Sequence, residues 1–446
     1  MERKDFYKRV FALVIPMALQ NLINVGVSAT DVVMLGKVGE QVLSGCSLGG
    51  QVFFIFNLFL FGTASGASVL TAQYWGKRDT DSIERLLGIV VRLAVTVGLI
   101  FMLGSFFFPE QIMYIFTDEP EIVAEGVKYL KIVAFTYPMV ALSMSYLNLI
   151  RSIEKVVIST VVYGSSLVVN FIINGILIFG LFGAPRLGIV GAAIGTLCAR
   201  FLELGIMLFY AYFRNDVIRL RLSCFLHPDK GLLQDFLKYS SPVVVNEFMW
   251  GAGYSAIAAI IGHLGSSAVA ANSVAQVMRQ LATVVVFGIG GATAILIGKA
   301  IGENKQEEAK IYAGRLIRLT VCFGFLGGLL VFLIRPFLVD AFGYTGVTAS
   351  LMNSFLMMMS YYVVAHSING TFIIGIFRGG GDTRFGMFLD SGILWGCSIL
   401  FGFLAAFVWK LPVNAVYFML LSDELVKFPL CCIRYRQKKW LKNVTR

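Results

Sequence analysis

The sequence predicts an all-α integral membrane protein whose twelve transmembrane helices form two six-helix lobes related by a parallel internal repeat. The first observation behind this fold class is composition. The 446 residues are 57% hydrophobic and 14% charged, against about 45–50% and about 25% in ordinary soluble domains, and the mean hydropathy is +0.79. So few charges could not cover a soluble surface, and much of the surface must therefore face lipid. The other two observations are the lengths of the apolar stretches and the repeat.

Twelve apolar stretches of the sequence are long enough to cross a bilayer, whose core of about 30 Å needs roughly 20 residues of helix. The longest segment between them has no room for a soluble domain. We therefore expect an N-lobe over 1–213, a cytoplasmic linker over 214–238 and a C-lobe with a basic tail over 239–446. The predicted spans are 10–36, 48–74, 86–108, 126–150, 157–181, 188–213, 239–262, 268–298, 312–335, 349–377, 386–409 and 413–433.

The positions of the basic residues predict the orientation of the spans. In a soluble protein, a net charge of +11 would suggest nucleic acid as a partner. Here, if the N-terminus is cytoplasmic, the inside ends hold 26 Lys and Arg residues and the outside loops hold 6. This is the positive-inside pattern of membrane proteins. We expect a monomeric, multi-pass protein of the bacterial inner membrane, with both termini cytoplasmic and no nucleic-acid partner.

Both ends of the chain fit this topology. The first apolar run opens at Val10 and continues past Pro16 without the cleavage pattern of a signal peptide, so it is expected to remain as the first span. The basic residues from Arg434 onward are typical of a flank that stops translocation. The seven cysteines include no CxxC pair, which argues against a disulfide framework or a zinc site.

The chain matches itself when it is shifted by 226 residues, without a gap over about 60 residues. Each half therefore contains six spans, and an even number gives both halves the same orientation, as in transporters built from parallel repeats. Two such bundles would enclose a central cleft that rocking could open to either side. The matching pairs are Pro16 and Pro242, Gly36 and Gly262, Gly39 and Gly265, Ser47 and Ser273, Gly62 and Gly288, and Gly76 and Gly302.

Ionisable residues inside predicted spans are candidates for function, because a charge at mid-span costs at least about 2.5–3.5 kcal/mol. Asp31 has no basic residue within a turn, and Glu247 lies near the middle of its span. Either carboxylate could hold a proton, or Na⁺ if further oxygens surround it. The alternatives are a polar helix cap for Asp31 and a structural bond to Arg279 for Glu247. Arg200 and Glu203, three residues apart, are expected to neutralise each other.

Polar residues that share helix faces could complete a cation site around Asp31. Asn170 and Asn174 are four residues apart and share a face, and with Thr196 they offer the neutral oxygens that a hard cation prefers. Hydrogen bonding between helices is the equally good alternative for the two asparagines.

The predicted cleft also needs a lining for substrate. The 226-residue shift aligns Gln20 and Asn21 with Asn246 and Glu247, so a polar patch is expected at the same depth in the membrane in both halves. The Met and Tyr residues near 358 could form an adaptable wall, although simple core packing explains them as well. The predicted cleft residues are Gln20, Asn21, Asn24, Asn246, Trp250, Arg279, Met358 and Tyr362.

Several kinds of site are absent from the sequence. Gly298-Lys299 resembles the end of a P-loop, but Thr293 and Ala300 replace the required Gly and Ser or Thr. The three His residues show no metal-ligand spacing. No cofactor and no nucleotide partner are expected, so transport would be driven by an ion gradient.

Five stretches of the sequence resemble bacterial members of the multidrug and toxic compound extrusion (MATE) family, and the resemblance runs over essentially the whole chain. It implies a V-shaped fold of two six-helix lobes and antiport of organic cations against Na⁺ or H⁺. The stretches are 170–180 with 187–193, 378–384, 390–395, 410–413, and the Asp423-Glu424-x-x-Lys427 motif.

The resemblance also implies a site in the N-lobe. Similar proteins of the DinF-like branch carry one on a span-1 Asp, two span-5 polar residues and a span-6 Thr, which are matched here by Asp31, Asn170, Asn174 and Thr196. Asn174 stands where the archaeal pattern has a second Asp. NorM-like members place acids on spans 7 and 10, but span 10 here offers only His366 and Asn369, so that site is not transferred as a unit.

Two other classes compete with a multidrug antiporter. A flippase for lipid-linked saccharides can share the lobe architecture, but its cleft would need several cations for a diphosphate, and only Arg279 and Arg200 qualify. An integral-membrane enzyme would need metal-binding acids at a membrane face, where the sequence has only a scattered group around Glu121. We therefore predict a transporter of small organic cations and not an enzyme.

Overall fold

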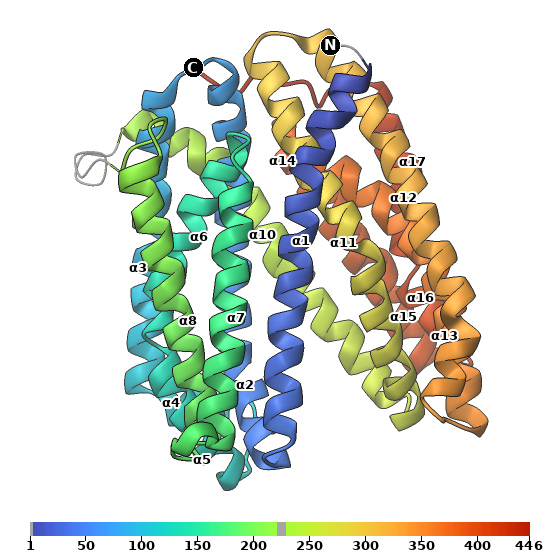
Figure 1. Cartoon of the computed structure of the whole chain (residues 1–446). Coiled ribbons are helices and arrows are strands. Elements are labelled where there is room, and N and C mark those ends of the chain that lie inside the picture. The colour runs from blue at the N-terminus through green and yellow to red at the C-terminus, as the bar shows by residue number, and fades with distance from the viewer. Residues whose placement is uncertain (1–2, 221–228) are drawn as a thin grey trace. The chain divides into compact units, whose positions relative to one another are not determined.

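A computed structural model describes residues 3–220 and 229–446, and over these residues the chain is helical without strands (Figure 1). Helices are expected in lipid because every backbone N–H and C=O must find a partner within the protein. Residues 221–228 of the predicted linker, which include Arg221 and His227, lie outside the described residues. The main helices are α1 Arg3–Gly36, α2 Glu40–Gly76, α3 Thr80–Phe107, α4 Pro109–Tyr114, α5 Pro120–Val133, α6 Thr136–Ser152, α7 Val157–Phe179, α8 Ile189–Phe209, α10 Lys230–His263, α11 Ser266–Gly302, α12 Gln306–Ala341, α13 Gly346–Gly370, α14 Thr383–Ile393, α15 Leu400–Phe403, α16 Val413–Leu420 and α17 Asp423–Arg436.

Short π-helical and 3₁₀ segments continue or follow several of these helices. A π-helical stretch fits an extra residue into a turn and shifts the faces that follow. These segments are η1 Leu181–Gly183, η2 Tyr210–Arg214, η3 Thr371–Phe377, η4 Leu394–Ile399 and η5 Leu404–Val408.

The described residues contain ten helices that are long and apolar enough to cross a membrane, or eleven if α5 and α6, bent by 52°, form one span. The all-helical membrane fold is therefore confirmed. The last of the twelve predicted spans, 413–433, is instead two short helices, α16 and α17. Asp423 and Glu424 interrupt the apolar run and occupy the first turn of α17, where the helix dipole favours acidic side chains.

By their packing the residues form two compact units. The N-unit comprises Leu19–Thr71 and Arg78–Ser240, and the C-unit comprises Met1–Ala18, Ala72–Lys77 and Ser241–Arg446. The chain thus passes from one unit to the other within α1, within α2 and within α10. The predicted lobes, 1–213 and 239–446, follow the order of the chain, and their boundaries stay a prediction.

Helices at equivalent places in the repeat have equal lengths. Both α1 and α10 have 34 residues and an internal proline, Pro16 or Pro242, and both α2 and α11 have 37 residues. Within the N-unit α3 packs along α6, and within the C-unit α12 and α13, which cover the equivalent positions, pack along each other. The internal repeat is therefore visible in the secondary structure as well as in the sequence.

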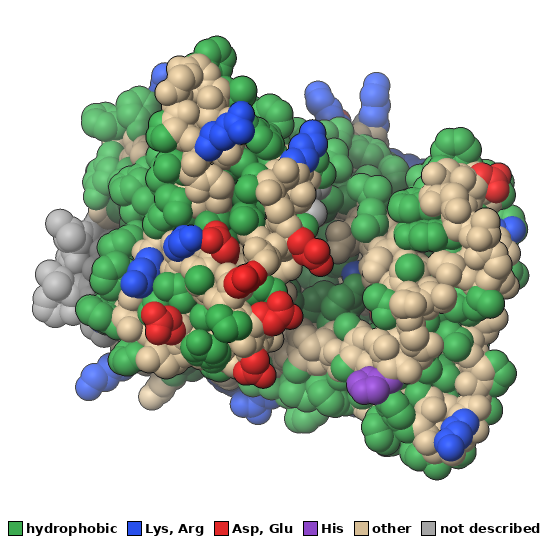
Figure 2. Space-filling view, turned by 90° about the horizontal axis from the view of Figure 1, so that it is seen from below, with side chains coloured by type: hydrophobic (Ala, Val, Ile, Leu, Met, Phe, Trp, Pro, Cys, Tyr) green, Lys and Arg blue, Asp and Glu red, His purple; other side chains and the backbone are tan. Residues whose placement is uncertain are grey.

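The surface of the chain carries many large hydrophobic side chains, as a lipid-facing surface requires. Figure 2 shows acidic side chains gathered at one end of the N-unit, where Asp118, Glu119 and Glu121 are exposed around the start of α5. These acids lie on an exposed part of the surface.

The basic C-terminal tail packs against the C-unit. Trp440 is buried, with 1% of its surface exposed. The Lys442 backbone N–H donates to Gly380 O at 3.0 Å, and the Val444 N–H donates to Gln73 Oε1 at 2.8 Å. Asp382 is paired with Arg434 at 2.7 Å and with Lys442 at 2.5 Å. The tail therefore does more than flank a span: it covers the ends of several helices.

Two glycines allow α2 and α11 to approach closely inside the C-unit. A Cβ on Gly76 would lie 2.2 Å from Lys299 O, and a Cβ on Gly302 would lie 1.9 Å from Gln73 O. The two contacts are reciprocal under the 226-residue shift. Small residues are typical of such close packing between membrane helices.

Gly302→Ala is expected to destabilise the protein by about 1–3 kcal/mol, because its methyl group would meet backbone that cannot rotate away. Gly290→Ala on the same helix is the matched control, since a Cβ there meets nothing within 4 Å. The melting temperature of each variant in detergent measures the effect. Equal melting temperatures for the two variants would contradict the close contact.

Candidate functional site

Each unit contains its own polar cavity. The N-unit cavity has a volume of about 370 Å³, and the C-unit cavity has a volume of about 150 Å³. Equivalent residues of the repeat, each pair 226 positions apart, line both cavities, so the repeat extends to the cavities. The pairs are Gln20 and Asn246, Asn21 and Glu247, Asn24 and Trp250, Asp31 and Ile257, Gly50 and Gln276, Phe53 and Arg279, and Phe61 and Phe287.

The structure brings together the four residues of the predicted ion site in the N-unit. Asn174 Nδ2 of α7 donates to Asp31 Oδ1 of α1 at 2.7 Å and to Asn170 Oδ1 at 3.2 Å. Asn170 Nδ2 in turn donates to Thr196 Oγ1 of α8 at 3.5 Å. Because Asn170 and Asn174 are one helical turn apart, a single face of α7 reaches both neighbouring helices.

This cluster contains an oxygen with no hydrogen-bond partner. Asn174 Oδ1 is buried and accepts no bond among the described residues, although buried acceptors are nearly always satisfied. Gly195 of α8 lies directly against it, since a Cβ on Gly195 would be 2.0 Å away. The cluster thus combines one carboxylate, an unsatisfied amide oxygen and a hydroxyl, which is a set suited to a small hard cation.

The other charged residues that line the N-unit cavity have local partners, which for Arg151 is the neutral Asn148. The predicted Arg200–Glu203 pair is confirmed, at 2.5 Å. The predicted cleft residue Gln20 is buried and donates to Val156 O at 3.2 Å and Thr160 Oγ1 at 2.9 Å, while Asn21 and Asn24 line the cavity. Of the charged residues that line this cavity, Arg200 and Glu203 therefore pair with each other, whereas Asp31 and Arg151 have neutral hydrogen-bond partners.

In the C-unit, the suggested bond between Glu247 and Arg279 is wrong. Glu247 pairs instead with Arg378, whose Nη2 lies 2.7 Å from Glu247 Oε1. Arg378 follows predicted span 10 and is 131 residues from Glu247 in the sequence, so residue spacing gave no sign of this partner. Asn246 also has a structural role, because its Nδ2 donates to Asp390 Oδ2 at 3.1 Å and its Oδ1 accepts from Ser391 at 2.7 Å.

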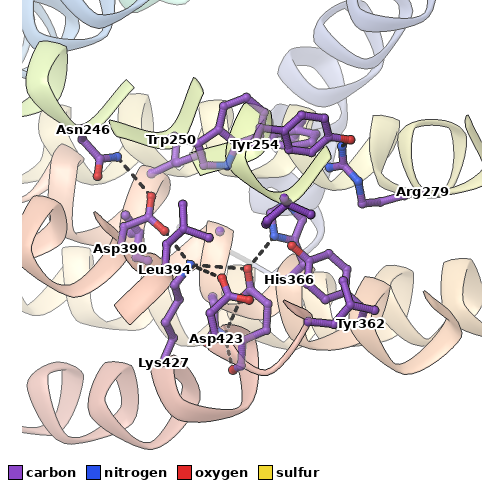
Figure 3. Close-up of a pocket in the computed structure, with 18 of the residues that line it drawn as sticks. Asn246, Trp250, Tyr254, Arg279, Tyr362, His366, Asp390, Leu394, Asp423 and Lys427 are labelled. Atoms are coloured by element: carbon purple, nitrogen blue, oxygen red, sulfur yellow. Dashed lines mark hydrogen bonds and ion pairs between the residues drawn. The ribbon is translucent and has the colours of Figure 1, made fainter. Parts of the chain in front are cut away.

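A buried network around Lys427 was not predicted as a site (Figure 3). Lys427 Nζ lies 2.7 Å from Asp390 and 2.8 Å from Asp423, with Glu424 at 3.6 Å. Glu424 also bonds His366 Nδ1 at 2.8 Å. The spacing of Asp423 and Glu424 from Lys427, four and three residues, places all three on one helix face and could have revealed the network.

Arg279 lies in the same cavity with neutral partners. Its Nε donates to Gln276 Oε1 at 2.8 Å and its Nη2 donates to Tyr254 OH at 3.2 Å. The Tyr254 ring stacks on Trp250, with centroids 5.4 Å apart. Aromatic and charged side chains therefore face the same space, as Figure 3 shows.

Only part of the predicted Met and Tyr wall faces the cavity. Tyr362 lines it and stacks on His366 at 5.3 Å. Met358 instead packs against the apolar core of the C-unit, and Met357 is exposed. Core packing was therefore the better interpretation of Met358.

Comparison with known proteins identifies the family. A model of the MatE family matches residues 16–176 and 242–404, which is more than half of the chain, and the two segments start at the offset of the internal repeat. The chain belongs to the MatE family. It is therefore a membrane transporter and not an enzyme.

Curated relatives of this MatE chain extend over almost its whole length. Probable multidrug resistance protein NorM of Thermotoga maritima is 23% identical over 444 residues, which cover 99% of this chain and 95% of the relative. Multidrug resistance protein PmpM of Pseudomonas aeruginosa is 23% identical over 399 residues, which cover 89% of this chain and 83% of the relative.

Solved structures show the same fold. A MATE transporter in a bent conformation matches with a TM-score of 0.87 at 17% identity, covering 98% of this chain and 96% of that one. A MOP-superfamily transporter from Pyrococcus furiosus matches with a TM-score of 0.85 at 18% identity, covering 97% and 96%.

No group of three or more His, Cys, Asp or Glu side chains could hold a metal ion within the described parts of this MatE chain. The three carboxylates that converge in the C-unit already surround the ammonium of Lys427. The oxygens around Asp31, mostly from neutral groups, are the set in which a monovalent cation would fit.

Lys427→Met is expected to lower the free energy of unfolding by about 3–5 kcal/mol, because buried carboxylates would lose their cation. Lys310→Met is the matched control. Lys310 pairs at 2.5 Å with Glu307, whose side chain is 83% exposed. Water screens that pair, so its loss should change the free energy of unfolding little. Melting temperatures in detergent compare the two, and equal values would show that the Lys427 network does not stabilise the C-unit.

Proposed function

We propose that this chain exports organic compounds, mainly cationic and amphipathic ones, across the cytoplasmic membrane in exchange for Na⁺ or H⁺. The two units would expose their binding sites to the two sides of the membrane in turn. The observation that carries the proposal is Asp31, a carboxylate in the N-unit cavity whose hydrogen-bond partner is the neutral amide of Asn174.

The surroundings of Asp31 support ion exchange. A carboxylate that is held away from water without a counter-charge gains much from binding a cation or a proton. Asn174 Oδ1, Asn170 Oδ1 and Thr196 Oγ1 are additional oxygens within the same cluster. Na⁺ could use them as ligands, whereas a proton would need only Asp31. In either case, a bound cation and an organic cation would compete for one negative charge, which is the requirement for antiport.

Two further observations support export of drug-like compounds. The curated relatives from Thermotoga maritima and Pseudomonas aeruginosa are named multidrug resistance proteins. Both cavities also combine a few charges with aromatic side chains, such as Phe53 in the N-unit and Trp250 in the C-unit, and such cavities suit amphipathic ligands.

Export of lipid-linked saccharides, the alternative function, is less well supported. A diphosphate would need several cations without counter-charges. In the C-unit cavity Lys427 is surrounded by carboxylates and Arg378 bonds Glu247. In the N-unit cavity Arg200 is paired with Glu203. This leaves one cation with neutral partners in each cavity, Arg151 and Arg279.

Asp31→Asn is expected to abolish uphill export while leaving the protein folded, because it keeps the shape of the side chain and removes its charge. The measurement is efflux of the fluorescent cation ethidium from vesicles containing the purified chain, with Na⁺ and H⁺ gradients imposed separately. The gradient that drives wild-type export identifies the coupling ion.

Asp340→Asn, at an exposed position of α12, is the matched control and should export at the wild-type rate. Wild-type rates for the Asp31 variant would remove Asp31 from the coupling site. A wild-type protein that responds to neither gradient would overturn the proposed function itself.

We also propose that the protein lies in a bacterial inner membrane with both termini in the cytoplasm, as the positive-inside pattern suggests. A single cysteine replacing Phe182, which is 95% exposed, should then react from outside intact cells with a membrane-impermeant thiol reagent. A single cysteine replacing the exposed Lys439 should react only after the cells are opened. The reverse result would invert the topology.

A further inference from the structure

We propose that the C-unit binds the headgroup of an anionic phospholipid near the Gln306 end of α12, where Arg315, Arg318 and Tyr435 hold the phosphate. In the proposed topology this end faces the cytoplasmic leaflet. The site is separate from both polar cavities, because none of these three side chains lines either of them. The inference therefore does not depend on the transported compound or on the coupling ion.

The apolar run of α12 places Arg318 at the edge of the membrane core. Residues 319–334 contain no charged side chain, and Arg318 and Arg335 stand at the two ends of this run. At 1.5 Å per residue the run is about 24 Å long, close to a hydrocarbon core of about 30 Å. Arg318 is exposed, so its long side chain is expected to reach the level of the lipid phosphates.

Both arginines of the site carry a charge that the protein does not match. Arg318 has no acidic partner within ion-pair range among the described residues. Arg315 is half-buried, and its Cζ lies 5.1 Å from the centroid of the Phe6 ring of α1. Its Nη1 is enclosed without a hydrogen-bond partner in the part of the chain that the structure describes. Since buried donors are nearly always satisfied, this pair of cations indicates an anion from outside the protein.

Tyr435 of α17 supplies a neutral hydroxyl beside the arginines. A Cβ on Gly314 would lie 3.7 Å from Tyr435 OH, and Gly314 and Arg318 share a face of α12 because they are four residues apart. Arg318 also interacts electrostatically with Tyr435. The rings of Phe372 and Trp440 contact the Tyr435 ring, with centroids 5.5 and 5.9 Å away. These contacts hold the hydroxyl in place as a further donor to a phosphate oxygen.

The face of α12 that continues from Arg318 suits the acyl chains of a lipid. Cys322, Phe325 and Leu329 follow at the spacing of one helix face. Cys322 is exposed, and Phe325 and Leu329 are 60% and 52% exposed. A cationic end followed by an apolar stripe matches the two parts of a phospholipid, whereas a soluble phosphate compound would use only the cationic end.

The charges at this end of α12 favour an anionic headgroup over a zwitterionic one. Glu307 and Glu308 lie in the first turn of the helix, about 10 Å or more along the axis from Arg315, so they offer little to the ammonium group of phosphatidylcholine. The two arginines carry two positive charges, and each planar guanidinium can bind phosphate through two parallel hydrogen bonds. Basic sites between helices on the cytoplasmic side typically bind anionic lipid headgroups.

Native mass spectrometry of the purified full-length chain tests this proposal, because each bound lipid appears as a separate mass. Phosphatidylglycerol and phosphatidylcholine with identical acyl chains are the two probes. Phosphatidylglycerol should bind about tenfold more tightly, the difference expected for one charge-assisted hydrogen bond. An excess of glycerophosphoglycerol, the same headgroup without acyl chains, should not displace the bound lipid.

Variants assign the preference to the site. Arg318→Gln removes an exposed charge, so it should leave the chain folded and lose most of the preference, and Tyr435→Phe should lose part of it. Arg335→Gln, at the other end of the same apolar run, is the matched control. Arg214→Gln, at an exposed position of η2 in the N-unit, controls for the loss of one positive charge. Both controls should keep the preference, and melting temperatures show that each variant is folded.

Three results would overturn the lipid site. They are equal wild-type affinities for the two lipids, a folded Arg318→Gln variant that keeps the preference, and an equal loss in Arg214→Gln, which would mean that net charge alone sets the preference. Displacement by glycerophosphoglycerol would instead indicate a site for soluble phosphates and would also overturn the proposal. No ion gradient enters the measurement, so its outcome and that of the antiport proposal are independent.

Discussion

A charge buried between membrane helices must be matched by another charge, and this constraint organises both units of the protein. Arg200 and Glu203 satisfy it within one helix turn, whereas Glu247 and Arg378 satisfy it across more than a hundred residues of sequence. In the C-unit the constraint is met by a group, with one ammonium among three carboxylates. These pairs fix the register of α10, α14 and α17, because sliding one helix by a turn would leave several charges unmatched.

Not every charge in the cavities is matched in this way. Arg151, at the end of α6, bonds the neutral Asn148. Asp31 and Arg279 each line a cavity with only neutral hydrogen-bond partners, and each occupies a position where the other half of the repeat has an apolar residue, Ile257 or Phe53. The two have opposite charge. The duplicated cavities have thus diverged in electrostatic character while keeping their positions on the helices, which would allow one protein to treat two chemical groups differently.

The sequence was sufficient for features that depend on local periodicity. Apolar length located most of the spans, and the repeat found in the sequence agrees with the equal lengths of α1 and α10. The four-residue spacing predicted that Asn170 and Asn174 share one helix face, and the structure places that face beside Asp31. Features that depend on contacts between distant segments were missed. Arg378 as the partner of Glu247 is one example. The burial of Trp440 in the C-terminal tail is another, because basic and aromatic residues near a terminus give no local sign of which helices they cover.

The passage of the chain between units inside α1, α2 and α10 has a consequence for the origin of the fold. Residues 1–18 belong to the compact unit that is otherwise built mainly from the second half of the chain, while residues 230–240 belong to the N-unit. A half-length ancestor with this design would have lacked part of its own core until a second copy supplied it. We expect such a protein to have been stabilised as a dimer that exchanged helix ends, and gene fusion would then have joined a domain-swapped assembly into one polypeptide.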